Sequence, residues 1–305
     1  MFRNGKLARA GCPRTSLDRK RGVCPRFRPA WEETSLNTPW NPAVLVIGRD
    51  RLFYSGLAGN SKKPRKLGNF KLYFATDTPF EIDAGQGWQD AQAALVRPYQ
   101  THRLLAPSGH IHEIGLEPES LSDTAQAQLT ALFATPQGCA TLAKRVRERH
   151  RRLPHLLPQN GLSTAAFDRL FLGQELAPRP MDERIRQVLQ LMCDEVEDST
   201  VAAEDYASEI GLSPSRFLYL FKLNTGVPFR SMRMWKRARR FLDHANSQRS
   251  LTDVALELGY PDSSHFSHSI RRTFGLKPRS IRQGSKHLKV YPGANYTLAP
   301  QIWAG

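Results

Sequence analysis

A group of imidazoles and one carboxylate near the middle of the chain has the residue types of a metal site. On a β-strand, His110 and His112 would point to the same face, as metal-ligand pairs do, and His102 and Glu113 are near them in sequence. A metal-dependent enzyme could use these four residues as ligands. A polar strand face is the simpler interpretation, because three convergent ligands around an open coordination position are not evident. We therefore expect neither a metal cofactor nor an enzyme.

The remaining candidate ligands are too scattered to form a site. His265 and His268 are about one helical turn apart, but no third ligand follows at helical spacing. The four cysteines, which contain no C-x-x-C pair, are Cys12, Cys24, Cys139 and Cys193. The sequence therefore predicts no structural metal site and no disulfide framework.

Positive charge is the stronger chemical feature of the sequence. The formal net charge is +16, and residues 210–289 contain sixteen Lys and Arg but only four Asp and Glu. Such an excess attracts polyanions such as nucleic acid, although an arginine-rich solvated surface would have the same composition. Composition does not decide between these interpretations, so the pattern within the segment must.

The basic segment contains an internal repeat. Ala207 and Gly211 recur 48 positions later as Ala255 and Gly259. Three further positions recur 49 positions later, namely Phe217, Phe221 and Gly226, which return as Phe266, Ile270 and Gly275. One residue has therefore been added inside the turn of the second copy, and the chain carries two copies of one supersecondary unit.

Each copy has the composition of a helix-turn-helix unit. The small side chain of Ala207 or Ala255 lets the second helix approach the first closely, and the repeated glycine supplies the left-handed conformation at which the first helix ends. Ser213 is expected to cap the second helix of the first unit, and Asp262 or Ser263 that of the second.

A predicted helix joins the two units. It begins at Pro228 and runs to about Asn246, with apolar residues at steps of three or four. At ~1.5 Å per residue its length is roughly 28 Å. Successive major grooves on one face of B-DNA are about 34 Å apart. One polypeptide could therefore place two helices in adjacent grooves.

Several motifs of this region match a known pattern. They include Ala207-x-x-x-Gly211-Leu212-Ser213, Thr225-Gly226-Val227-Pro228-Phe229, Leu251-Thr252-Asp253-Val254-Ala255 and Phe274-Gly275-Leu276-Lys277-Pro278. With them, residues 181–283 resemble the C-terminal domain of the AraC/XylS transcription regulators. The resemblance implies sequence-specific binding of double-stranded promoter DNA, most often by an activator that also contacts RNA polymerase.

The resemblance also implies which side chains meet DNA. By position, the base-reading residues are Ser215, Arg216, Leu218 and Tyr219 in the first unit and Ser263, Ser264, Ser267 and His268 in the second. Phosphate contacts, which position the protein without reading sequence, are expected from Lys222, Arg271 and Arg272. Several relatives carry Arg or Gln at the positions of Tyr219 and His268, so the target sequence is not predicted.

The sequence indicates an α+β multidomain chain. Residues 1–38 are basic and lack periodic apolar positions, which predicts a disordered arm. Short apolar runs over residues 39–118 are typical of a β-sandwich or barrel, and three- and four-residue steps predict a helical linker or dimerisation region over 119–178. An all-α domain with two helix-turn-helix units is expected over 179–284, followed by a tail over 285–305.

The strand-rich region is loosely similar to cupin-like sensor domains. Pro98-Tyr99-Gln100-Thr101-His102 is similar to a cupin's later proline and histidine, whereas the earlier His-x-His motif is missing. The resemblance implies a small-molecule effector site or a homodimer contact there. No apolar run is long enough to cross a membrane and no secretory signal is evident, which predicts a cytoplasmic protein.

A nonspecific DNA-binding protein that acts through charge alone is the alternative. Its affinity would fall steeply with salt and would show little preference among sequences. Competition with random DNA at about 0.15 M salt would distinguish it from a specific regulator.

Overall fold

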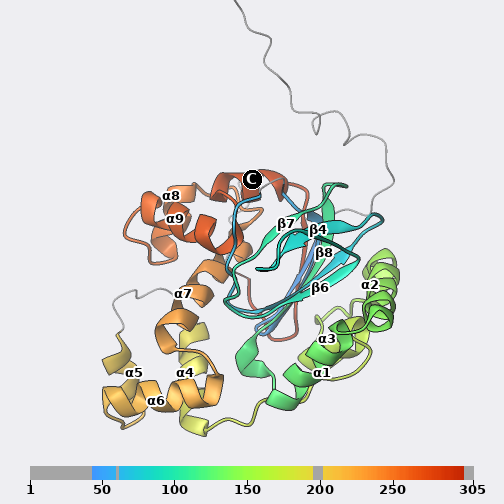
Figure 1. The fold of residues 1–305 in the computed structure, drawn as a ribbon. Helices are drawn as coiled ribbons and strands as arrows, with labels where there is room; N and C mark the ends of the chain where they lie inside the picture. The colour runs from blue at the N-terminus through green and yellow to red at the C-terminus, as the bar shows by residue number, and fades with distance from the viewer. Residues whose placement is uncertain (1–42, 60–61, 195–201, 299–305) are drawn as a thin grey trace, which may run out of the picture. The chain divides into compact units, whose positions relative to one another are not determined.

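Strands form the first part of the chain and helices most of the rest, as the sequence periodicities predict (Figure 1). The computed structural model describes residues 43–59, 62–194 and 202–298, so the predicted disordered arm over 1–38 lies outside the described residues. The described residues form one compact unit. Within the described residues, no helix combines the length and apolar character needed to span a bilayer.

The strands form two open sheets. A six-stranded sheet has the order β6-β3-β8-β2-β1-β9, and a three-stranded sheet has the order β5-β4-β7. The strands are β1 Val44–Ile47, β2 Arg51–Leu57, β3 Phe70–Ala75, β4 Phe80–Asp83, β5 Gln89–Ala91, β6 Ala93–Val96, β7 Arg103–Leu105, β8 His110–Leu116 and β9 Lys289–Pro292. Because the edge strands β6 and β9 do not pair with each other, the described strands do not close into the predicted cupin-like barrel.

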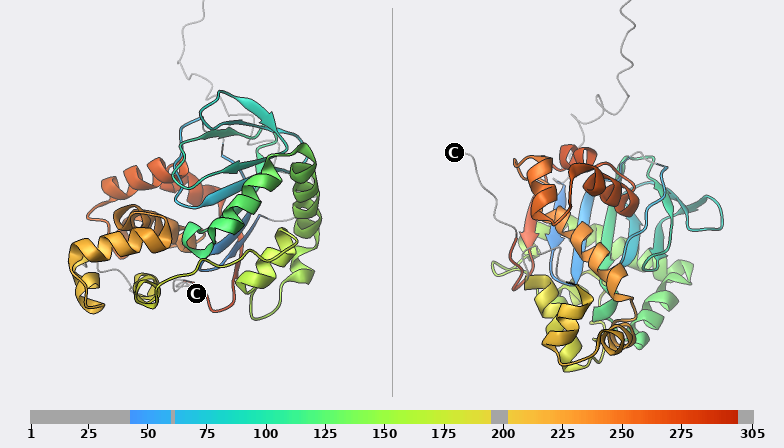
Figure 2. Two further views of the ribbon diagram at one scale, coloured as in Figure 1. Left: turned by 60° about the horizontal axis from the view of Figure 1, so that its bottom comes forward. Right: turned by 90° about the vertical axis from the view of Figure 1, so that its left-hand side faces the viewer.

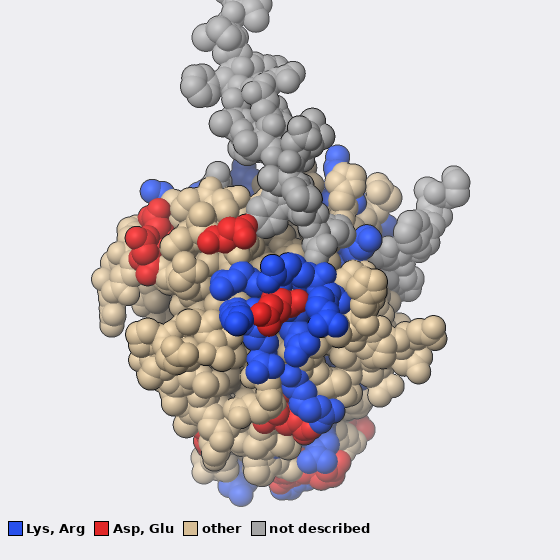
Figure 3. Space-filling view, turned by 90° about the vertical axis from the view of Figure 1, so that its right-hand side faces the viewer, with Lys and Arg blue, Asp and Glu red and all other residues tan. Residues whose placement is uncertain are grey.

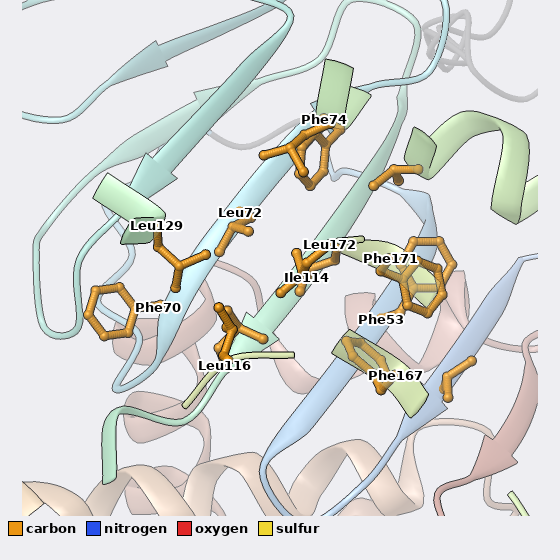
Figure 4. Packing of buried hydrophobic residues seen from close by; sticks show 14 of the residues in the cluster. Phe53, Phe70, Leu72, Phe74, Ile114, Leu116, Leu129, Phe167, Phe171 and Leu172 are labelled. Atoms are coloured by element: carbon orange, nitrogen blue, oxygen red, sulfur yellow. The ribbon is translucent and has the colours of Figure 1, made fainter. Parts of the chain in front are cut away.

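Three helices cover one face of the six-stranded sheet: α1 Asp123–Phe133, α2 Pro136–Leu156 and α3 Thr164–Phe171. Side chains alternate between the faces of a strand, so Phe70, Leu72 and Phe74 of β3 all point toward these helices (Figure 4). They share a buried core with Phe53 and Phe171, whose ring centroids are 4.4 Å apart. This core holds α2 against the sheet by its apolar side.

The opposite face of this sheet has two coverings. Tyr73 and Ala75 pack against Phe80 and Ile82 of the smaller sheet, so the two sheets share a core as in a sandwich. On the other half, apolar residues of β1 and β2 pack against residues that follow α7, namely Leu45, Ile47 and Leu52 against Leu242 and Ala245. The right-hand view of Figure 2 shows the orange helices in front of the strands and the green helices behind them.

The helical part contains the predicted repeat. Its elements are α4 Glu183–Asp194, α5 Ala203–Glu209, α6 Pro214–Thr225, α7 Phe229–Arg240, α8 Leu251–Glu257, α9 Ser263–Phe274 and α10 Pro278–Gly284, with short 3-10 helices η1 Pro118–Ser120 and η2 Phe241–His244. Helices α5 and α8 have seven residues each, and α6 and α9 have twelve each. The two copies therefore agree element by element.

The connection between the two units differs from the single helix predicted from Pro228 to about Asn246. Helix α7 ends at Arg240, and the chain continues as the tighter η2. Phe241 is buried among the apolar residues of the second unit, and Asp243 accepts a hydrogen bond from Tyr296 at 2.9 Å. These buried contacts accompany the tighter winding, and α7 with η2 spans ~26 Å.

The chain returns to the sheet near its end. Residues 285–305 were expected to form a tail, yet β9 pairs in parallel with β1, with Val44 opposite Lys289 and Ile47 opposite Pro292. A four-residue strand ending in proline carries too little alternation to be predicted from sequence. The sheet thus contains segments from both sides of the helical part.

Candidate nucleic-acid interface

The turns of the two helix-turn-helix units have the same backbone geometry. Gly211 and Gly259 have φ of +65° and +67°, the left-handed region that favours glycine. The backbone N–H of Leu212 donates to Ala207 O at 2.8 Å, and that of Tyr260 donates to Ala255 O at 2.9 Å. Ala207 and Ala255 are fully buried where the helices meet. The repeated sequence pattern therefore forms the same turn in both units.

The second helices begin at different caps. Ser213 Oγ accepts from Arg216 N at 3.4 Å, whereas the Asp262 carboxylate accepts from Ser264 N at 2.7 Å and from His265 N at 2.8 Å. Asp262 rather than Ser263 is thus the cap of α9. The hydrogen bonds from the backbone and ring of His265 lower the pKa of Asp262, which keeps this cap anionic at the helix N-terminus.

Aromatic side chains hold the inner faces of both second helices. In the first unit the Phe217 ring lies 5.2 Å from that of Phe229. In the second unit the Phe266 ring lies 5.2 Å from Phe241 and 5.3 Å from Tyr260. Such packing fixes the rotation of each helix about its axis. Which residues face outward is therefore determined.

The outer faces of α6 and α9 carry the predicted DNA-contacting residues. Ten of the eleven are exposed, and only Ser267 is half-buried; the exposed ones are Ser215, Arg216, Leu218, Tyr219, Lys222, Ser263, Ser264, His268, Arg271 and Arg272. The two units thus present mostly polar and cationic side chains, with Leu218 among them, on the sides of α6 and α9 that the core leaves uncovered.

Known proteins share this region. A family model described as a helix-turn-helix domain matches residues 206–284. The arabinose operon regulatory protein of Escherichia coli is 28% identical over 137 residues, which are 44% of this chain and 46% of that protein. The transcriptional activator RhaS of Klebsiella pneumoniae is 36% identical over 106 residues, which are 34% of this chain and 37% of RhaS. The C-terminal part of the chain is an AraC-type helix-turn-helix domain.

The matches are confined to part of each relative. The chain covers less than half of the length of these two regulators. Among solved structures, that of ToxT from Vibrio cholerae O395 is similar over 76% of this chain and 97% of ToxT, with 13% identity and a TM-score of 0.47. The AraC-type domain is thus the part of the chain that the comparisons identify.

Within the AraC-type domain, α6 presents a partly apolar outward surface. The Arg216 guanidinium lies 5.6 Å from the centroid of the Tyr219 ring, a cation-π distance that orients both groups. Leu218, Tyr219 and Leu223 are 43%, 59% and 62% exposed. Leu223 was not predicted, although its exposure follows from helical spacing, because it lies four residues after the exposed Tyr219 on the same face of α6. This apolar surface can contact thymine methyl groups.

A buried polar cluster joins the β-rich part to the AraC-type domain. We call it the Glu117 cluster, and it consists of Glu117, Glu119, Trp235, Lys236 and Arg239. Glu117 Oε2 accepts from Trp235 Nε1 at 2.8 Å and from Lys236 Nζ at 2.9 Å, and Lys236 Nζ lies 2.5 Å from Glu119 Oε1. Arg239 Nε lies 3.1 Å from Glu117 Oε1, within ion-pair distance but without hydrogen-bond alignment. Two acids of η1 and its flank thus face two cations of α7.

Beside this cluster, the backbone of the β-rich part makes two close contacts with the AraC-type domain. A Cβ atom on Gly68 would lie 2.2 Å from Trp235 Cγ, so only glycine fits there. The backbone N–H of Lys66 donates to Thr273 O near the end of α9 at 3.0 Å. No sequence pattern relates these residues, because their partners are far apart in the chain. The cluster and these contacts fix α7 and α9 against the β-rich part.

The four residues of the metal-site interpretation do not converge. His112 lies on the helix-covered face of the sheet, where Nδ1 is 2.9 Å from Ser55 Oγ and the ring is 4.7 Å from that of His150. Glu113 points to the opposite face and pairs with Lys71 at 2.7 Å. On that face His102 Nε2 lies 2.8 Å from Tyr73 Oη. Within the described residues no group of three or more candidate ligands could hold a metal ion.

The buried His112 predicts a pH-dependent stability. Burial, reinforced by the nearby His150, lowers its pKa to about 3. An unfolded histidine titrates near 6.5, so between about pH 6.5 and pH 3 the unfolded state binds a proton that the folded state does not. The contribution of His112 to the free energy of unfolding is therefore fully present above about pH 6.5 and decreases as the pH drops through this window. At pH 5 the decrease is about 2 kcal/mol. Urea unfolding at pH 8 and pH 5 should show His112→Gln losing about 2 kcal/mol less than the wild type.

The control for this measurement is His287→Gln, which replaces an exposed histidine. It should leave the difference between the two pH values as it is in the wild type. If His112→Gln lost as much stability as the wild type between pH 8 and pH 5, His112 would not be neutral in the folded protein.

Proposed function

We propose that this chain is a sequence-specific transcription regulator that binds promoter DNA with α6 and α9 in two adjacent major grooves. The observation that carries this proposal is the duplicated unit. The turns at Gly211 and Gly259 share one geometry, and the second helices end at Gly226 and Gly275 with φ of +74° and +72°. The ~26 Å span of α7 and η2 is comparable with the distance of about 34 Å between successive major grooves.

The exposed faces support separate roles for two groups of residues. Ser215, Arg216, Leu218 and Tyr219 of α6 and Ser263, Ser264, Ser267 and His268 of α9 read base edges. Lys222, Arg271 and Arg272 contact phosphates from the later turns of the same helices. The cation-π contact between Arg216 and Tyr219 orients the guanidinium before DNA arrives, which reduces the entropy lost on binding.

Two substitutions should separate these roles. Arg216→Ala is expected to cost about 1 to 3 kcal/mol of binding free energy and to relax the preference at one base pair. Arg272→Ala is expected to weaken binding to all sequences alike and to reduce the slope of affinity against salt by about 1. Binding measured against a panel of single-base operator variants distinguishes the two. The reverse pattern would contradict the assigned roles.

The β-rich part has a regulatory role in this proposal. It binds a small-molecule effector or a second copy of the chain, and the regulator activates transcription through RNA polymerase. The Glu117 cluster supports this role, because it connects the β-rich part directly to the helix between the two DNA-binding units. A change in the β-rich part can therefore alter the placement of α6 relative to α9.

Selection of bound genomic fragments tests the proposal. The purified full chain is incubated with sheared DNA of the source genome at about 0.15 M salt, and the retained fragments are sequenced. A shared motif with two half-sites about one helical turn apart is expected. The control is the Arg216→Ala protein, which should retain fragments with a relaxed motif. Retention of unrelated fragments by the wild type would instead favour binding through charge alone.

A further inference from the structure

A second cationic surface lies on α2, outside the AraC-type domain. We call it the α2 basic surface, and it consists of Lys144, Arg145, Arg147, Arg149, Arg151 and Arg152. Lys144, Arg151 and Arg152 are exposed and the other three are half-buried. Figure 3 shows Lys and Arg gathered on the face of the molecule that carries α2. Glu148 is the one acid between residues 144 and 152.

These cations have no carboxylate partners among the described residues. None of the six lies in an ion pair there, and Arg147 Nη1 donates to Ala75 O at 3.4 Å. Like charges four residues apart, such as Arg145 and Arg149, destabilise a helix. Leu142, Val146 and Leu153 on the buried side hold α2 in place despite this repulsion. The charge pattern opposes helix stability, which points to a role in binding.

The surface fits one class of partner best. A second copy of α2 would bring like charges together, and insertion into a lipid layer would need the apolar side of α2, which is buried in the core. Five of the six cations are arginine, whose planar guanidinium binds phosphate with two parallel hydrogen bonds. Residues 144–152 cover ~12 Å of helix, and DNA carries about seven phosphate charges over the same length. The number of cations is therefore close to the number of phosphate charges over that length.

We propose that the α2 basic surface binds the phosphate backbone of a second DNA segment. Helix α2 covers one face of the six-stranded sheet, whereas the residues that follow α7 cover the other face. A straight duplex held by α6 and α9 therefore does not extend along α2. The second segment is flanking DNA that bends around the protein, or a separate duplex. This inference depends on the proposed function for one point only, namely that the bound phosphate polymer is DNA.

Three matched variants of the full chain test the proposal. The first removes cations of α2 (R149Q, R151Q, R152Q), the second removes those of α6 and α9 (K222Q, R271Q, R272Q), and the third is a control that removes three exposed cations elsewhere (K62Q, R97Q, K289Q). Glutamine keeps the helix propensity at the positions of α2, α6 and α9, and the three control positions are exposed, so each variant should fold, which circular dichroism checks. The probe is a fluorescein-labelled duplex of 20 base pairs and random sequence, and its anisotropy is measured between 50 and 200 mM NaCl.

The α6 and α9 variant should still bind the random duplex through α2. Adding the α2 substitutions to it should weaken the remaining affinity about tenfold or more at 50 mM NaCl and reduce the slope of log K against log salt by about 3. Adding the control substitutions instead should leave the affinity within about twofold. Equal affinity and slope with and without the α2 substitutions would overturn the proposal.

Two further outcomes are decisive. If polyglutamate of equal charge displaced the duplex from the α6 and α9 variant as well as unlabelled DNA does, the surface would bind acidic protein segments, and the DNA assignment would be wrong. With two differently labelled duplexes, the wild type should hold both at once and the α2 variant only one. If genomic selection gave no motif while the α2 substitutions still removed a bound duplex, the proposed function would fail and this inference would stand.

Discussion

Glu117→Ala is expected to lower the free energy of unfolding by about 3 to 5 kcal/mol, because it removes one partner of a buried ionic network. Glu117 is 1% exposed. Burial opposes ionisation of its carboxyl group, but the charges of Lys236 and Arg239 outweigh burial and hold the pKa of Glu117 below its usual value. Without this carboxylate, the two cations and the Trp235 N–H would be left buried with fewer acceptors. Urea unfolding followed by tryptophan fluorescence measures the loss.

Two controls identify the cause. Glu117→Gln keeps an acceptor for Trp235 but loses the charge, so it should retain part of the stability. Glu209→Ala removes an exposed carboxylate and should change the stability by less than about 0.5 kcal/mol. A Glu117→Ala protein as stable as the Glu209→Ala protein would mean that the Glu117 cluster does not hold α7 against the β-rich part.

Phe266→Ala is expected to cost about 3 to 5 kcal/mol and to abolish DNA binding by the second unit. The Phe266 side chain is fully buried and contacts the rings of Phe241 and Tyr260. Its removal leaves a cavity beneath α9, and this helix has no other aromatic side chain of comparable burial. The outward residues of α9 would then lose their fixed orientation. Urea unfolding and binding to the selected genomic motif measure the two effects.

The neighbouring Ser264→Ala is the control for stability, because Ser264 is exposed on the same helix. It should leave the free energy of unfolding within about 0.5 kcal/mol of the wild type. Phe217→Ala, the counterpart in the first unit, should cost a similar amount and remove the other half-site from the motif. If Phe266→Ala bound the full motif with wild-type affinity, α9 would not read DNA.

Local backbone requirements explain what could be predicted from the sequence. The glycines and alanines of the repeat are dictated by turns and close helix contacts within a few residues, so their spacing predicted both helix-turn-helix units. The residues of α6 and α9 expected to meet DNA came from the resemblance to known regulators. The end of α7 was less predictable, because η2 depends on the packing of Phe241 and on the contact between Asp243 and Tyr296. Those partners are distant in sequence.

Contacts between distant segments explain what could not be predicted. Glu117 and Lys236 are 119 positions apart, and neither residue type is unusual where it occurs. His112 and Glu113 alternate along β8, which predicts opposite faces, but the position of His102 depends on how the loop before β7 returns to the sheet. The order of the strands likewise includes β9, which no local pattern connects to β1.

The parallel pairing of β1 with β9 restricts how the DNA-binding half can move. A domain joined to its neighbour by one covalent connection can swing freely about that hinge. Here the polypeptide leaves the β-rich half before α4 and comes back as β9, so two chain connections restrict such a swing, in addition to the contacts of the Glu117 cluster. Wider motion requires β9 to detach, and the bare edge of β1 would then be open to a strand from another molecule.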